Sequence, residues 1–233
     1  MKIALCILNK NEAPCLKLML PMLPKPGPES GFDIMVAIDG NSTDGSPEIL
    51  KQFGIPVVGQ SALGRGQAFH TAFKNVEADA YIFFSPDGNE DHKDLPRFRK
   101  LLESGADLVI ASRMMKGAFN EEDVHLWRPR KWVNNAFNLL ANLIFNRFRQ
   151  PYITDSINGY RAITKAAVNK LKLDAPDYTI EYQMTMRAMR DGLNIREFPT
   201  YEGQRLAGDT GAPSFPTGVK FIKRLISEIK LLF

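Results

Sequence analysis

The stretch YIFFSPDGNEDHKDLPRF, residues 81–98, joins a short apolar run to a cluster of acids. Residues 81–84 are continuously apolar, as in a strand that is covered on both faces. The residues that follow predict a helix over 92–105, ended by Gly105. Four acids lie between the strand and the helix or at the start of the helix: Asp87, Glu90, Asp91 and Asp94. This strand–loop–helix unit is typical of an α/β fold.

The same unit recurs along the first half of the chain. Further strands are expected at residues 3–8, 32–40, 55–60 and 107–113, and further helices at 15–23, 47–53 and 64–76. The second half is less regular, with helical spacing in 127–149 and 179–192, a strand at 194–200 and an amphipathic helix that closes the chain. Short strands that alternate with helices predict a largely parallel sheet with helices on both faces.

Composition and charge limit the classes of partner and the cellular compartment that we expect for this chain. The chain has 233 residues, a formal net charge of +4 and a pI of about 9.0, which suits one sizeable domain or two small ones. A mildly basic chain is attracted to anionic lipid, nucleic acid or phosphate-bearing substrates, but nucleic-acid motifs are absent and we expect no nucleic-acid partner. No signal peptide or spanning helix is expected. Cys6 and Cys15 are interpreted as a buried hydrophobe and a free thiol, which favours a reducing compartment.

Polar clusters fall where the predicted strands end. Asp39, Gly64-Arg65-Gly66, Ser85-Pro86-Asp87 and Ser112-Arg113 each follow a strand. In open α/β sheets, ligands bind beyond the carboxyl ends of the strands. The sequence therefore predicts a binding site at this one edge.

The acid-rich loop offers ligands for a hard cation. The Asp87 carboxylate and the Asn89 amide are two residues apart, and Mg²⁺ or Mn²⁺ is usually held by one or two carboxylates together with phosphates and water. The plainer interpretation is a solvated loop before a helix whose positive end suits acids. That interpretation explains the positions of Glu90, Asp91 and Asp94, but it explains the position of Asp87 poorly.

Other clusters leave two interpretations open. The segment DGNSTDGS is typical of turns and helix caps, which accounts for Asp44. Asp39 is better placed to accept a hydrogen bond from a ribose hydroxyl or from an N–H of a nucleotide base. The loop GRGQ can bind phosphate through backbone N–H groups or can be a simple turn. Among the basic residues, Arg113 and Arg205 are the preferred phosphate partners, ahead of a larger set: Lys116, Arg128, Arg130 and Lys131.

Taken in order, these motifs make the chain resemble the family 2 glycosyltransferases of the GT-A fold, and most of all the branch with dolichyl-phosphate mannose synthase and polyprenyl-phosphate sugar transferases. The resemblance covers nearly the whole chain. It is carried by ILNKNEAPCL, IDGNSTDGS, GRGQAF, SPDGNEDHKDLP, ASRMMKG, ITDSINGYRAI and RLAGDT. These segments are similar to the family's I-P-x-x-N-E, D-(D/G)-(G/N)-S-T-D-G-T, G-K-G-x-A, D-x-D-x-Q, S-R-x-x-x-G, T-D-x-x-S-G-(F/Y)-R-A and R-x-x-G-x-S.

The resemblance implies an inverting transfer of a sugar from a GDP- or UDP-sugar, with a divalent metal at Asp87 and Asn89. The donor would be bound by Leu8, Asn9, Asn11, Glu12, Asp39, Asn41, Gly64, Arg65, Gly66, Ser85, Pro86 and Asp87. A lipid phosphate would be received by Arg113, Lys116, Arg128 and Arg130. Asp155 and Glu181 are alternative general bases for a hydroxyl acceptor, and Arg205 would close over the donor phosphates.

The resemblance also divides the chain. It implies one domain over residues 1–215, with a donor half (1–113) and an acceptor half (114–215), and a C-terminal amphipathic helix over 216–233 that lies on a membrane surface or packs on protein. The expected location is cytoplasmic, peripheral to a membrane, and a homodimer is left open. Ser85 replaces the first acid of D-x-D and Leu8 replaces the opening proline. A soluble or glycan acceptor and a catalytically silent sugar-nucleotide binder therefore stay open as alternatives.

Overall fold

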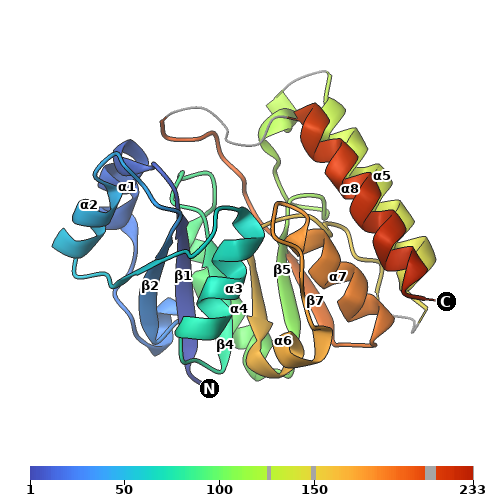
Figure 1. Ribbon diagram of the computed structural model, residues 1–233, viewed down its shortest axis with the longest axis horizontal. Coiled ribbons are helices and arrows are strands. Elements are labelled where there is room, and N and C mark those ends of the chain that lie inside the picture. Colours follow the sequence, from blue (N-terminus) through green and yellow to red (C-terminus); the bar gives the residue numbers. More distant parts are fainter. Residues whose placement is uncertain (125–126, 148–150, 208–213, 233) are drawn as a thin grey trace.

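The protein is described here by a computed structural model that covers residues 1–124, 127–147, 151–207 and 214–232 (Figure 1). Its centre is one seven-stranded sheet in the order β3-β2-β1-β4-β6-β5-β7. The strands are β1 (Ile3–Asn9), β2 (Ile34–Asp39), β3 (Val57–Gly59), β4 (Ala80–Phe84), β5 (Leu108–Ser112), β6 (Arg161–Thr164) and β7 (Ile195–Pro199). The helices are α1 (Ala13–Met19), α2 (Ser46–Gln52), α3 (Arg65–Asn75), α4 (Leu95–Glu103), α5 (Pro129–Phe145), α6 (Lys165–Leu171), α7 (Ile180–Arg190) and α8 (Ser214–Lys230).

Helices cover both faces of the sheet because its strands are apolar on both faces. In β4, Tyr81 and Phe83 point to one face while Ile82 and Phe84 point to the other, as the two-residue period of a strand requires. One face packs against α1, α2 and α4, and the opposite face packs against α3 and α5 to α8. The predicted α/β architecture is confirmed.

The sequence did not predict β6 or α6. Strand β6 lies between β4 and β5 and runs antiparallel to both, whereas the other neighbouring strands are parallel. The strand has four residues and begins with Arg161, so it lacks an apolar run long enough to be recognised. Arg161 is nevertheless fully buried, because carbonyl oxygens of Ser156, Asn158 and Glu181 accept its N–H groups.

The C-terminal helix is packed into the domain. Helix α8 begins at Ser214, slightly before the expected start, and its Phe221 and Leu225 are buried. The buried Glu228 of α8 forms an ion pair with Arg187 of α7 at 2.8 Å. In the described parts of the chain, no helix combines the length and the apolar character that crossing a bilayer requires.

Candidate active site

A cavity of about 850 Å³ lies at the carboxyl edge of the parallel strands. It is lined by residues from the ends of β1 and β4, the start of α3, the segment 176–178 and the segment around Arg205. Ten residues that the sequence predicted are among its lining: Leu8, Asn9, Asn11, Glu12, Gly64, Arg65, Ser85, Pro86, Asp87 and Arg205. A second hollow, of about 790 Å³, lies between residues 22–30 and the start of α4, and none of the predicted site residues line it.

Three charged side chains from distant parts of the chain meet in the cavity. Arg205 donates from Nη1 to Asp87 Oδ2 at 2.7 Å and from Nη2 to both carboxylate oxygens of Glu12 at 2.8 Å. Each of these side chains keeps 13–20% of its surface exposed. Burial raises the pKa of Asp87 above its ordinary value, although Arg205 opposes the shift. The Nε atom of Arg205 is buried without an acceptor, so this guanidinium has a hydrogen bond left to offer.

The loop after β4 fits a divalent cation that also binds substrate phosphate. Asn89 donates its backbone N–H to Asp87 Oδ1 at 3.4 Å, and Asn89 Oδ1 is buried without a hydrogen-bond partner. The described residues contain no cluster of three or more carboxylate, cysteine or histidine ligands. Because Mg²⁺ is commonly held by one or two carboxylates with phosphates and water, a pair such as Asp87 and Asn89 suits this kind of site.

Glu90 has a different role from the one the sequence indicated. It was expected as a solvated loop charge, but its Oε2 turns back and accepts from the N–H of Ser85 at 2.8 Å. Burial, reinforced by the neighbouring Asp87 carboxylate, raises the pKa of Glu90 well above its ordinary value. Asp91 caps the following turn at Lys93 N, as expected, while the buried Asp94 accepts from the hydroxyl of Thr200 at 2.6 Å. Glu90 therefore shapes the loop that presents Asp87.

The two glycines of GRGQ allow two backbone segments to lie close together. A Cβ atom at Gly64 would collide with the carbonyl oxygen of Pro176, and one at Gly66 would collide with that of Ala175. Gly64 also has φ +137°, a backbone conformation that residues with a side chain rarely adopt. Gly66 does not line the cavity. These glycines therefore allow α3 to begin against the segment before α7, where Arg65 faces the cavity.

Arg65 is held by Glu181, the second candidate base. Its Nε forms a short ion pair with the Glu181 carboxylate, which is almost completely buried. Gly159 leaves room for this pair, because a Cβ there would collide with the guanidinium. Glu181 itself does not line the cavity.

Asp39 organises the strand ends beside the cavity. Its carboxylate accepts from Asn9 Nδ2 at 2.6 Å and from the N–H and hydroxyl of Ser42 at 2.9 and 2.7 Å. Asp39 and Asn41 do not line the cavity, and their contact with a donor stays a prediction. Asp44 accepts from the N–H of Ala13 at 2.8 Å and so fixes the start of α1.

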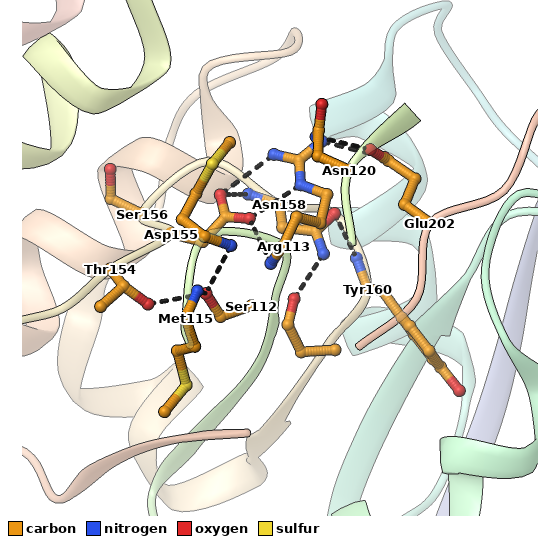
Figure 2. A network of polar contacts seen from close by, with 12 residues as sticks. Ser112, Arg113, Met115, Asn120, Thr154, Asp155, Ser156, Asn158, Tyr160 and Glu202 are labelled. Atoms are coloured by element: carbon orange, nitrogen blue, oxygen red, sulfur yellow. Dashed lines mark hydrogen bonds and ion pairs between the residues drawn. The ribbon is translucent and has the colours of Figure 1, made fainter. Parts of the chain in front are cut away.

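Arg113 and Asp155 bind each other in a network of polar contacts (Figure 2), and neither residue lines the cavity. Arg113 donates to both oxygens of Asp155 at 2.7 and 3.0 Å and to Glu202 at 3.0 Å. Asp155 has no exposed surface. Although burial opposes its ionisation, Arg113 holds the pKa of Asp155 below its usual value. Asn120 donates to the other oxygen of Glu202 at 2.8 Å and completes the network.

The remaining candidates for phosphate binding also lie outside the cavity lining: Lys116, Arg128 and Arg130. Arg128 pairs with Asp123 at 2.8 Å, and Arg130 lies 3.7 Å from Glu121. The lining does contain residues that sequence reasoning missed: Lys10, Cys15, Asp177, Tyr178 and Lys220. Lys220 lies 3.3 Å from Asp177. Its only sequence signal was its place on the basic side of the C-terminal helix.

Comparisons with known proteins identify the family and the fold of the chain. The sequence matches the family described as "Glycosyl transferase family 2" over residues 5–172. It is 28% identical over 176 residues to glycosyltransferase AglJ of Haloferax volcanii, covering 74% of this chain and 54% of the relative. It is 26% identical over 192 residues to the dolichyl-phosphate hexose transferase of the same organism, covering 82% of this chain and 79% of the relative. The chain spans about half the length of AglJ and of the hexosyltransferase Agl6, another relative from that organism.

A solved structure shares the fold. Glucosyl-3-phosphoglycerate synthase from Mycobacterium tuberculosis, in complex with Mn²⁺, UDP and phosphoglyceric acid, superimposes with a TM-score of 0.72 at 19% identity. The match covers 98% of this chain and 78% of the other. The mostly parallel sheet with flanking helices is therefore the GT-A fold, and the chain belongs to glycosyl transferase family 2.

Proposed function

We propose that this protein transfers a sugar, with inversion, from a GDP- or UDP-sugar to a polyprenyl phosphate. The observation that carries the proposal is the meeting of Glu12, Asp87 and Arg205 in the cavity at the sheet edge. The lipid acceptor is supported by relatives named dolichyl-phosphate hexose transferase and polyprenol monophosphomannose synthase. Two buried, unpaired cysteines also support a cytoplasmic location.

In this proposal the cavity residues divide the work on the donor. Asp87 and Asn89 would hold Mg²⁺ or Mn²⁺, which supplies positive charge next to a leaving diphosphate when it is bound. Arg205 would exchange its hydrogen bonds to Asp87 and Glu12 for bonds to the donor phosphates, which frees Glu12 to accept a hydrogen bond from the ribose or the base. Preorganised cations of this kind stabilise charge that develops in the transition state.

The state of the two candidate bases favours a phosphate acceptor over a hydroxyl acceptor. A lipid phosphate is already an anion near neutral pH and needs no strong general base, whereas a hydroxyl must lose its proton. Asp155 is bound to Arg113 and Glu181 to Arg65, and both carboxylates are buried. If Arg113 receives the acceptor phosphate, it must first give up part of its pairing with Asp155.

The first test is titration calorimetry with UDP and GDP, with and without Mn²⁺. We expect one nucleotide to bind more tightly when Mn²⁺ is present, and Asp87→Asn to weaken that binding about tenfold or more. Asp91→Asn is the matched control, because Asp91 caps a turn outside the cavity. Metal-dependent binding that survives unchanged in Asp87→Asn would remove the assigned role of this residue.

The acceptor is tested by transfer of labelled sugar to a short-chain polyprenyl phosphate or to 3-phosphoglycerate. The proposal expects label in the organic-soluble lipid product. Label only in the soluble product would replace the lipid acceptor by a soluble one. Nucleotide binding without transfer to either would favour the catalytically silent alternative.

A further inference from the structure

One end of the molecule presents an apolar surface on two neighbouring helices. Helix α8 runs beside α5 there (Figure 1), and the rings of Phe137 on α5 and Phe221 on α8 pack at 5.4 Å. Large apolar side chains on these helices, and that of Trp127 just before α5, are exposed. They define the α5–α8 face: Trp127, Trp132, Val133, Leu139, Leu140, Leu143, Val219, Ile222 and Ile226.

The face is separate from the core that the same helices build. Phe137, Ala141 and Phe145 of α5 are buried, whereas Leu143 is 71% exposed. Trp132, Leu139 and Leu143 are spaced at seven and four residues, which places them on one side of a helix. Several large exposed apolar side chains on two neighbouring helices are typical of a site of interaction.

The apolar residues of α8 lie on the side away from the cavity. Lys220 forms an ion pair with Asp177, and Arg224 forms one with Asp174. Both pairs lie on the flank of α8 that faces the segment before α7. Ile222 and Ile226 each follow one of these basic residues by two positions, a rotation of roughly 200° about the helix axis. They therefore lie on the opposite flank.

The exposed charges of α8 beside the face are positive, whereas beside α5 the basic residues Arg128, Arg130 and Lys131 pair with Asp123 and Glu121. Helix α8 contains one acid, Glu228, which is 1% exposed and paired with Arg187. Lys223 and Lys230 are exposed. The basic flank that α8 adds to this apolar surface complements anionic lipid headgroups.

Both tryptophans of the chain belong to this face. Trp127 is 74% exposed, and its ring lies 5.7 Å from that of Trp132. Tryptophan is enriched where a protein meets the membrane–water interface, because its ring is apolar and its N–H is polar. This composition fits a bilayer surface better than a protein partner, since exposed lysines are depleted in protein interfaces.

We propose that the α5–α8 face docks on an anionic lipid bilayer. Lys220 of the same helix lines the cavity, so docking through the opposite flank of α8 places the cavity one helix away from the bilayer surface. The consequence for catalysis, delivery of a lipid phosphate from the bilayer, rests on the proposed function, whereas docking itself does not.

Tryptophan fluorescence tests docking directly. The chain is titrated with vesicles of phosphatidylcholine alone and of phosphatidylcholine with phosphatidylglycerol. We expect a blue shift of the emission with the anionic vesicles, because both emitters enter the interface, and quenching by brominated lipids. Wild-type emission that no vesicle changes would overturn the proposal.

Substitutions on the face and away from it supply the control. Leu143→Glu and Ile226→Glu are expected to weaken vesicle binding by about tenfold to a hundredfold, the effect of losing one buried aliphatic side chain. Leu18→Glu on α1 changes an equally apolar, 54% exposed residue outside the face and should bind as wild type does. Equal binding by all three variants would contradict the assignment of this surface.

Two further measurements separate docking from its rivals. Sedimentation equilibrium without lipid should show the same mass for wild type and Leu143→Glu; a wild-type dimer that this variant dissociates, with no vesicle binding, would make the face a contact between two copies instead. Calorimetry with nucleotide should be unchanged in both face variants. Vesicle binding without nucleotide binding would leave docking standing and remove the proposed function.

Discussion

Arg205 and Arg113 are both arginines bonded to two acids, yet only Arg205 lines the cavity. Arg113 uses Nε, Nη1 and Nη2 on Asp155 and Glu202, and Asp155 is completely buried. Arg205 uses two nitrogens on Glu12 and Asp87 at a cavity wall, and its Nε has no acceptor. The first arrangement is satisfied within the protein, whereas the second has capacity left for a ligand.

The difference teaches how to separate structural charge from functional charge in this chain. A buried charge that loses a partner cannot turn to water, so a closed network contributes to the fold. A charge at a cavity wall keeps its access to water and ligands and can exchange one partner for another. Three predictions test this contrast through the free energy of unfolding, beginning with the largest change.

Breaking the closed network should cost the most. Asp155→Ala leaves Arg113 with Glu202 as its remaining carboxylate partner, and loss of one member of a buried pair costs about 3–5 kcal/mol. Urea unfolding measures the change, with Asp191→Ala, which affects a pair with the adjacent Arg190, as the control. An Asp155 variant that keeps wild-type stability and loses only transfer activity would make Asp155 the catalytic base.

Protonation of Glu197 should give an intermediate effect. This residue of β7 accepts from the N–H groups of Thr154 and Asp155, and burial raises its pKa from 4.5 to about 7. Because the folded state binds the proton of Glu197 more tightly than the unfolded state does, protonation of Glu197 stabilises the fold. This stabilisation is fully present below pH 4.5 and is lost as the pH rises through about 7. We expect the free energy of unfolding to fall by roughly 3 kcal/mol over this window.

Urea unfolding at a series of pH values checks this expectation, and Glu197→Gln should flatten the profile. A wild-type stability that rises between pH 5 and 7 would contradict it. What pH dependence remains in Glu197→Gln includes the other acids whose pKa burial raises, namely Asp87, Glu90 and Glu121, and their contributions to stability change in the same direction.

The smallest change in stability is expected at the cavity. Arg205→Met removes two partly exposed ion pairs, with Glu12 and Asp87, and should alter the free energy of unfolding by about 1 kcal/mol or less. Affinity for the nucleotide should nevertheless fall about tenfold to a hundredfold, because charge-assisted hydrogen bonds to phosphate are lost. Arg205→Lys is expected to retain part of the binding. A variant that is strongly destabilised but binds normally would place Arg205 with the structural charges.

Sequence reasoning succeeded where the signal was local. The polar residues that end β1 and β4 lie at the cavity because the carboxyl ends of parallel strands share one edge. It failed at β6, whose four residues begin with an arginine, and at Glu90, which turns back to Ser85. Lys220 and Tyr178 were missed because their place at the cavity depends on how α8 and the segment before α7 pack.

The sequence by itself determined the alternation of strands and helices, the two-faced apolar sheet and the edge at which polar residues gather. These features follow from periodicity and from residue type along short segments. Only the tertiary structure decided that Arg113 closes on Asp155 while Arg205 stands at the cavity with Glu12 and Asp87. The members of these pairs are 42 to 193 positions apart, and the strength of a charge–charge contact depends on distance and on exclusion of water, which arise only when the chain has folded.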